Sequence, residues 1–267
     1  PAVHGDSLYV GSNDHCLYRV GLADGKKRWE YATGLFVQGT PLVLDEPALV
    51  IVGSHDQKLH AVKRETGEAA WTSPAGGVVT GGPVCWNGQV LFGANDGNLH
   101  AVDAAKGKAQ WQVACGGDLA APIVVAGDVA YVATKAGALH AVDLKGRKLA
   151  WTAETGGAVF GAPALDGERV LVGTLNGHLH AFGRADGKPA WTFAAEGAIA
   201  GGAALADGKA FFGARDGWIY VLDAASGTLE WRVQARGPVN GTPLVHEGTL
   251  YVGSDDGQLY AIRLGGS

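Results

Sequence analysis

The chain has 267 residues, of which 47% are hydrophobic and 18% charged, with 43 Gly and 10 Pro. This composition excludes a disordered chain, and no apolar run approaches the roughly 18 residues of a membrane-spanning helix. The net charge is −5, and Lys and Arg are scattered along the chain in runs of no more than three. A nucleic-acid-binding protein would need a clustered basic face.

Cysteine usage gives no framework for the fold. Cys16, Cys85 and Cys115 are odd in number and lack CxxC spacing. The sequence therefore predicts buried free thiols rather than a zinc site or a set of disulfides.

One phrase recurs along the whole chain. It reads VGSHDQKLHAV from Val52 and FGARDGWIYVL from Phe212, and seven such copies begin at Val10, Val52, Phe92, Val132, Val172, Phe212 and Val252. Six Trp recur with them at intervals of 42, 40, 40, 40 and 40 residues: Trp29, Trp71, Trp111, Trp151, Trp191 and Trp231. A fixed period of this size indicates a repeat architecture.

Each repeat divides into four short β segments. In the last copy the first three are 239–245, 249–253 and 258–262, and in the other copies a fourth begins at the repeat Trp. Tight hairpins join the second and third segments at Asp96-Gly97, Asn176-Gly177, Asp216-Gly217 and Asp256-Gly257. Four strands in about 40 residues are the period of a propeller blade.

The sequence thus predicts an all-β, seven-bladed β-propeller of four-stranded antiparallel blades, with residues 1–267 as one domain. Pro recurs inside the expected first strand, at positions 41, 83, 122, 163 and 243. Because Pro cannot donate to a ladder, that strand is expected at an edge, beside a central channel. Gly39, Gly81, Gly161, Gly201 and Gly241 would allow the blades to converge there.

The two ends of the chain give a further expectation. It starts at Pro1-Ala2-Val3, partway into a first strand, and ends at Gly265-Gly266-Ser267, before a seventh Trp. The last blade is therefore expected to lack its outer strand. A segment upstream of Pro1 in the parent protein is expected to supply it.

The segments Asp103-Ala104-Ala105-Lys106-Gly107 with Trp111, and Asp223-Ala224-Ala225-Ser226-Gly227 with Trp231, resemble the Trp-docking repeat of PQQ-like β-propellers. The resemblance covers the whole chain and implies that each Trp packs between neighbouring blades. The family includes quinoprotein dehydrogenases, the BamB subunit of the outer-membrane β-barrel assembly machinery, and sensor domains of bacterial Ser/Thr kinases.

The enzymatic alternative is disfavoured by the residues. The quinoprotein dehydrogenases that the chain resembles have eight blades, adjacent cysteines over the cofactor and a Ca²⁺ site, and none of these patterns is recognisable here. PQQ is a tricarboxylate, yet the presumed channel mouth offers only Lys135, Arg215 and Arg236. We therefore expect no catalytic residue and no cofactor, PQQ being unsupported.

Two further periodic sets could suggest metal binding. One repeat position holds His60, His100, His140 and His180 in four consecutive copies, and its equivalents in the other copies are Tyr18, Tyr220 and Tyr260. Blades pack about 10 Å apart, so one His per blade cannot share an ion, and packing is expected. The turn residues Asp14, Asp56, Asp96, Asp216 and Asp256 are expected to bond their own turn backbone rather than calcium.

A binding site should lie where the repeat varies. Loops leading to the next blade and the hairpins between strands two and three are expected on one face. The candidate site residues at the channel mouth are Gln38, Thr80, Asp118, Phe160, Asn240, Arg215 and Trp218, with Phe36 exposed and Leu119 standing in the ring before Ala120. Exposed aromatics are typical contact anchors, although Phe160 and Trp218 could equally fill the channel or pack between blades.

The sequence predicts a monomeric, non-catalytic binding module for a protein partner or a small ligand, with no nucleic-acid partner. The resemblance implies an extracytoplasmic sensor or interaction domain of a receptor Ser/Thr kinase. The alternatives are a BamB-like protein-binding scaffold in outer-membrane protein assembly and, third, a PQQ-dependent dehydrogenase.

Overall fold

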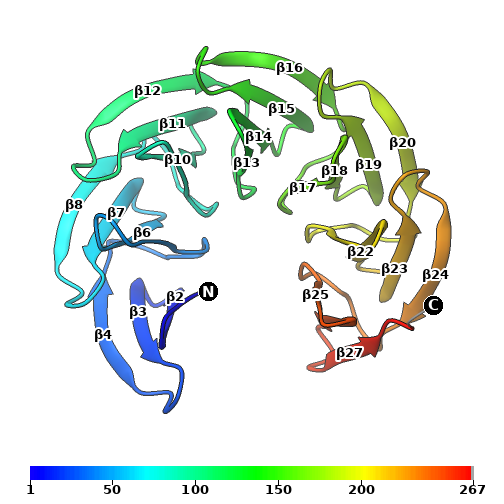
Figure 1. Ribbon diagram of the computed structural model, residues 1–267, viewed down its shortest axis with the longest axis horizontal. Coiled ribbons are helices and arrows are strands. Elements are labelled where there is room, and N and C mark those ends of the chain that lie inside the picture. The colour runs from blue at the N-terminus through cyan, green and yellow to red at the C-terminus, as the bar shows by residue number, and fades with distance from the viewer. Residues whose placement is uncertain (266–267) are drawn as a thin grey trace. The chain divides into compact units, whose positions relative to one another are not determined.

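The computed structural model describes residues 1–265, and every regular element among them is a β-strand. The strands form seven sheets in chain order, and within each sheet they lie side by side in sequence order (Figure 1). Six sheets have four strands and the last has three. The all-β prediction and the three-stranded last sheet are confirmed. Gly266 and Ser267 lie outside the described residues.

The first four sheets have the following bounds: β1 (Ala2–His4), β2 (Ser7–Gly11), β3 (Cys16–Gly21), β4 (Lys27–Ala32); β5 (Leu42–Leu44), β6 (Leu49–Gly53), β7 (Lys58–Lys63), β8 (Ala69–Pro74); β9 (Val84–Trp86), β10 (Gln89–Gly93), β11 (Asn98–Asp103), β12 (Ala109–Ala114); β13 (Val124–Ala126), β14 (Val129–Ala133), β15 (Ala138–Asp143), β16 (Lys148–Glu154).

The last three sheets continue the pattern: β17 (Ala164–Leu165), β18 (Arg169–Gly173), β19 (His178–Gly183), β20 (Pro189–Ala194); β21 (Ala204–Ala206), β22 (Lys209–Gly213), β23 (Trp218–Asp223), β24 (Leu229–Gln234); β25 (Leu244–His246), β26 (Thr249–Gly253), β27 (Leu259–Arg263).

The chain divides into two compact units. Unit 1 comprises Pro1–Val132 with Val142–Leu149, and unit 2 comprises Ala133–Ala141 with residues 150–265. The division falls within the fourth sheet, so sheets one to three belong to unit 1 and sheets five to seven to unit 2. The interpretation of 1–267 as one domain stays a prediction.

The first strands are shorter than expected, and the expectation that the recurring Pro lie inside them is wrong. Strands β5, β9, β17 and β25 each begin directly after a Pro, at Leu42, Val84, Ala164 and Leu244, and Pro122 lies two residues before β13. The missing N–H of Pro ends the ladder there. The first strand nevertheless lies at the sheet edge, as predicted.

The glycines before these strands lie where neighbouring sheets approach each other. A Cβ on Gly39 would come within 2.8 Å of the Gly81 carbonyl oxygen in unit 1. In unit 2, a Cβ on Gly161 would come within 2.3 Å of the backbone of Gly201. A side chain at Gly39, Gly81, Gly161 or Gly201 would force the sheets apart, which confirms the structural role predicted for these four glycines. For Gly241 the prediction is wrong, because a Cβ there would have no heavy atom within 4 Å.

The predicted hairpins are confirmed as short turns closed by a residue in the left-handed region. Gly97 and Gly217 have φ of 81° and 84°, and they close the turns between β10 and β11 and between β22 and β23. The first two sheets carry His15 and Gln57 at this position, with φ of 75° and 66°. Left-handed φ is unfavourable for a residue with a Cβ, so these two turns hold local strain.

The repeat Trp residues join neighbouring sheets, as the resemblance implied. In unit 1 the Trp71 indole N–H donates to the Ala104 carbonyl of the next sheet at 3.2 Å. In unit 2 Trp191 makes the same bond to Ala224, also at 3.2 Å. A Cβ on Gly107 would come within 2.4 Å of the Trp71 ring, so glycine admits the indole.

The third sheet departs from this arrangement. Trp111 donates to the side chain of Gln89 in its own sheet at 2.9 Å. Arg147, with φ of 53°, stands at the place that Gly67 and Gly107 hold in their sheets. The docking pattern is therefore tied to glycine at this turn position.

Cys115 is buried, Cys16 is half-buried and Cys85 is exposed, so the expectation of buried thiols is correct for Cys115 and wrong for Cys85. Burial raises the pKa of the Cys115 thiol to about 11. Cys85 lies in the edge strand β9, where alternate side chains face solvent. Within residues 1–265, no helix is long and apolar enough to cross a lipid bilayer.

Candidate functional site

Hairpins and inter-sheet loops form one surface in each unit, here called the hairpin face. The backbone N–H of His55, in the hairpin between β6 and β7, donates to Phe36 in the loop that precedes β5, at 3.0 Å. In unit 2 the N–H of Arg215 donates to Ala198 at 2.9 Å in the same manner. The prediction that these loops share a face is confirmed.

In five of the hairpins, an Asp carboxylate accepts hydrogen bonds that hold the turn in place. Its Oδ1 accepts the N–H two residues later, from Cys16, Lys58, Asn98, Trp218 and Gln258 respectively. The predicted bond to the turn backbone is therefore confirmed. Oδ2 accepts from the repeat His or Tyr four residues on, as in Asp56 with His60 at 3.0 Å and Asp256 with Tyr260 at 2.7 Å.

Two of these carboxylates also bond the loop that precedes their hairpin. Gly34 N–H donates to Asp56 Oδ2 at 2.9 Å, and Arg236 N–H donates to Asp256 Oδ2 at 3.1 Å. The Tyr260 hydroxyl, first among these donors, holds the pKa of Asp256 below its usual range. Burial acts to raise the pKa of Asp56, but the Gly34 and His60 bonds outweigh it and the pKa is lowered.

His180 in β19 differs because Asn176 replaces the Asp of its hairpin. The imidazole Nδ1 contacts Thr192 Oγ1 at 3.0 Å. Burial, and then the nearby His178, lower the pKa of His180. Within residues 1–265, no three His, Cys, Asp or Glu side chains gather as a metal site. The repeat His residues thus serve as packing and hydrogen-bonding groups, as predicted.

In unit 1 the face carries a hydrogen-bonded set of two amides and one imidazole. Gln38 Nε2 donates to Asn13 Oδ1 at 3.1 Å, and Gln38 Oε1 contacts His55 Nε2 at 3.0 Å. Thr80, from the next loop, is half-buried. Of the predicted site residues in this unit, only Gln38 belongs to the hydrogen-bonded set.

In unit 2 two of the equivalent three positions carry charge. Arg215 Nε donates to Asn240 Oδ1 at 2.9 Å, and Asn240 Nδ2 donates to Asp255 Oδ2 at 2.7 Å. Two predicted residues, Arg215 and Asn240, are thus brought together. Asp255 completes the set and was missed, although its hairpin position is the one that Arg215 occupies in the preceding repeat.

The predicted aromatics of unit 2 lie in different surroundings. Phe160 is 40% exposed, and Lys135 Nζ lies 5.6 Å from its ring centre. Trp218 is half-buried, with the Arg232 guanidinium 4.0 Å from its ring centre. Arg232 is in turn paired with Glu196 at 2.8 Å. One face of Trp218 is therefore covered by the protein itself.

The expected place of Leu119 in the exposed ring is wrong. Leu119 is fully buried and occupies the core position that Val37 holds in its own loop. Its N–H donates to the Ala94 carbonyl, just as Val37 N–H donates to Ser12. Ala120 therefore stands at the position of Gln38. Asp118 lies at that of Phe36.

The exposed pair Leu35 and Phe36 belongs to the face of unit 1 and only Phe36 was predicted. These side chains are 44% and 38% exposed. Alignment of the six loops would have found Leu35, because the other five have Gly at its position, at 77, 117, 157, 197 and 237.

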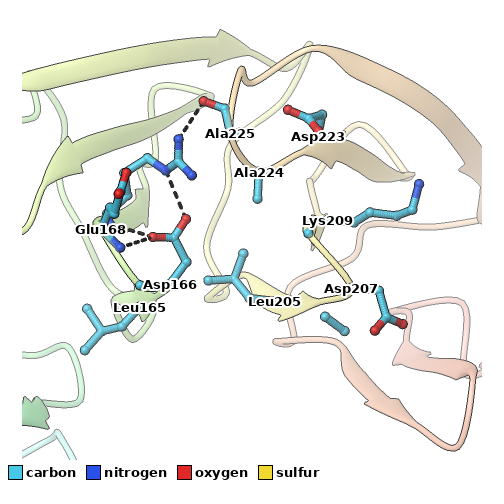
Figure 2. Close-up of a pocket in the computed structure, with 13 residues that line it drawn as sticks. Leu165, Asp166, Glu168, Leu205, Asp207, Lys209, Asp223, Ala224 and Ala225 are labelled. Atoms are coloured by element: carbon cyan, nitrogen blue, oxygen red, sulfur yellow. Dashed lines mark hydrogen bonds and ion pairs between the residues drawn. The ribbon is translucent and has the colours of Figure 1, made fainter.

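A separate hollow of about 560 Å³ lies in unit 2 between sheets five and six (Figure 2). Arg169 and Lys209 line it together with the carboxylates of Asp166, Glu168, Asp207 and Asp223. Arg169 pairs with Asp166 at 3.0 Å and donates to the Ala225 carbonyl at 2.8 Å. Lys209 pairs with Glu230.

These residues do not fit PQQ. A tricarboxylate needs unengaged cationic groups, ideally Arg in a bidentate geometry. Carboxylates outnumber the cations in the hollow, and the cations are engaged. On the hairpin face of unit 2, Arg215 is bonded to Asn240.

Repeats of this kind define the β-propeller fold, here with seven blades. The chain belongs to the PQQ-repeat family described as outer membrane protein assembly factor BamB, whose sequence profile matches residues 1–115, 95–198 and 175–265. No curated protein matches the chain in sequence.

Two solved structures share the fold. The computationally designed protein Ika8 has a TM-score of 0.82 at 16% identity, over 98% of this chain and 82% of its own. BamB from Moraxella catarrhalis has a TM-score of 0.63 at 17% identity, over 97% of this chain and 94% of its own.

Proposed function

We propose that this chain is a non-catalytic, protein-binding scaffold that recognises its partner through the hairpin face. One observation carries the proposal. The same three repeat positions form a bonded set in each unit, Asn13, Gln38 and His55 in one and Arg215, Asn240 and Asp255 in the other. The backbone beneath is the same in both, so the variation is confined to the surface that a partner would contact.

The family match supports a scaffold of the BamB type. The family's description names an outer-membrane protein assembly factor, which supports a protein as the partner and an extracytoplasmic compartment as the setting. The large aromatic and Arg side chains on the face are those enriched at protein interfaces. A sensor domain of a receptor Ser/Thr kinase stays a prediction, and the family match favours the scaffold.

Site-specific photo-crosslinking in the source cells tests the proposal. A photoreactive amino acid replaces Gln38 or Asn240 on the hairpin face, or Lys106 or Ser226 in the exposed turns between third and fourth strands as matched controls. We expect the first two positions to cross-link one protein that the controls do not. Equal cross-linking from both sets, or none from the face, would contradict the proposal.

A further inference from the structure

One loop in unit 1 departs from the repeat at consecutive positions. At the position of Leu35, glycine elsewhere makes room for the next hairpin: a Cβ on Gly77 would come within 2.6 Å of Asp96 N, and one on Gly197 within 2.4 Å of Asp216 N. Here a leucine occupies that position. Its carbonyl keeps the bonds of this repeat position: it accepts from Thr33 Oγ1 at 2.6 Å and from Ser54 Oγ at 3.1 Å, as Gly157 accepts from Thr155 and Gly237 from Ser254. The side chain is therefore what differs in this loop.

The two hairpins beside this loop also depart from the repeat. His15 and Gln57 hold left-handed φ of 75° and 66°, where the five other hairpins have glycine. Residues with unfavourable backbone conformations persist where the surrounding structure holds them, often at binding sites. Departures of two kinds, an exposed apolar pair and backbone strain, thus coincide at one place.

The side chains form a ring platform. Phe36 lies between two imidazoles, with its ring centre 5.2 Å from that of His15 and 5.6 Å from that of His55. We call Leu35, Phe36, His15 and His55 the Leu35–Phe36 platform. The amides of Gln38 and Asn13 border it through the Gln38 contact with His55.

The carboxylates of the two hairpins are engaged by the fold. Asp14 accepts the Tyr18 hydroxyl at 2.7 Å, and Asp56 accepts from His60 and Gly34. The platform therefore offers the apolar surface of Leu35 and Phe36, bordered by the amides of Gln38 and Asn13. These amides carry no charge, so a charged partner side chain would lose hydration on this surface without gaining an ion pair from them, whereas an uncharged side chain has less hydration to lose.

We infer that the Leu35–Phe36 platform binds an uncharged, extended peptide segment of the partner protein. One apolar side chain of the segment covers Phe36 and Leu35, and the Gln38 and Asn13 amides bond its backbone. This inference rests on the proposed function and specifies its partner in unit 1. Burying an exposed apolar side chain against such a platform is the kind of contact that dominates interface energies.

The test uses a library of random peptides displayed on phage and selected on the whole chain. The strongest selected peptide is synthesised, and its affinity is measured by calorimetry. The key variant is Leu35→Gly with Phe36→Ala, which gives this loop the Gly-Ala pair of the loops at 157–158 and 197–198 and is therefore expected to fold. Phe160→Ala is the matched control, because Phe160 is a similarly exposed phenylalanine in unit 2.

We expect selected peptides that are uncharged and contain an aromatic or aliphatic anchor. The double variant should weaken their binding at least about tenfold, and Phe160→Ala should leave it unchanged. Selection of charged peptides, selection of none, or equal binding by the double variant would overturn the inference. Cross-linking from Asn240 can succeed in each of these cases, so the proposed function is tested separately.

Discussion

The hairpin faces of the two units have the same arrangement of hairpins and loops, but they carry different side chains. In unit 1, Gln38 lies between Asn13 and His55, beside the exposed rings of the Leu35–Phe36 platform. In unit 2, Asn240 lies between Arg215 and Asp255, and Pro238 replaces Phe36. The central residue of both sets is an amide, Gln38 or Asn240, whereas its two hydrogen-bonding partners differ between the units.

The difference shows how a repeat protein can separate stability from recognition. Glycine at the close approaches, Trp between sheets and Asp in the hairpins recur because each sheet needs the same contacts to its neighbour. Surface positions have no such requirement. The predictions below test whether these recurring contacts contribute equally to stability in both units, and whether a residue that departs from the repeat lowers the free energy of unfolding.

Removing a docked Trp should have the largest effect, and it should be equal in both units. Trp71→Ala and Trp191→Ala each remove a large side chain between sheets and an indole bond of the same length, 3.2 Å. We expect each to lower the free energy of unfolding by about 3–5 kcal/mol, measured by urea denaturation. If only one of the two variants lost unfolding free energy, the Trp contacts of the two units would not be equivalent.

Removing the Asp of a hairpin should have the second largest effect on stability. Asp56→Ala and Asp216→Ala each leave the turn N–H and the partner His60 or Tyr220 without their acceptor. Each should cost about 1–3 kcal/mol of unfolding free energy. The Asn variants should cost less, because the amide oxygen can still accept the turn N–H. Equal losses for Ala and Asn would refute this role.

Exchanging the left-handed hairpin residues tests the strain argument. His15→Gly should raise the free energy of unfolding by about 1 kcal/mol, and Gly217→His in unit 2 should lower it by a similar amount, because only glycine adopts that φ without cost. Thermal unfolding of the two variants gives the comparison. If His15→Gly left the melting temperature unchanged, the turn in unit 1 would hold no strain.

The smallest expected effect is the pH dependence that His180, in unit 2, gives to the free energy of unfolding. Burial lowers the pKa of His180 in the folded protein below its unfolded value of about 6.5. Its contribution to stability is therefore complete above that value and declines as the pH falls from about 6.5 toward the folded pKa. His180→Tyr, the residue of three other sheets, should show a smaller loss of unfolding free energy between neutral and mildly acidic pH than the unmodified chain.

The sequence was sufficient to predict the sheets, because a Trp every 40 residues and Asp-Gly turns between alternating segments leave few other arrangements. It was insufficient where one residue shifts the register of a loop. Pro122 stands one position earlier than Pro83 does in its loop, which placed Leu119 on the surface although its side chain is buried. Bonds such as that between Asn240 and Asp255 depend on two loops that only the folded sheets bring together.

The account's central claim is that a protein partner binds the hairpin face. The most direct measurement is the affinity of the cross-linked partner for the variant Gln38→Ala with Asn240→Ala, beside the control Lys106→Ala with Ser226→Ala. We predict a loss of at least about tenfold for the first pair, no change for the second, and unfolding midpoints close to that of the unmodified chain. Equal affinity for both pairs, with both variants folded, would contradict the claim.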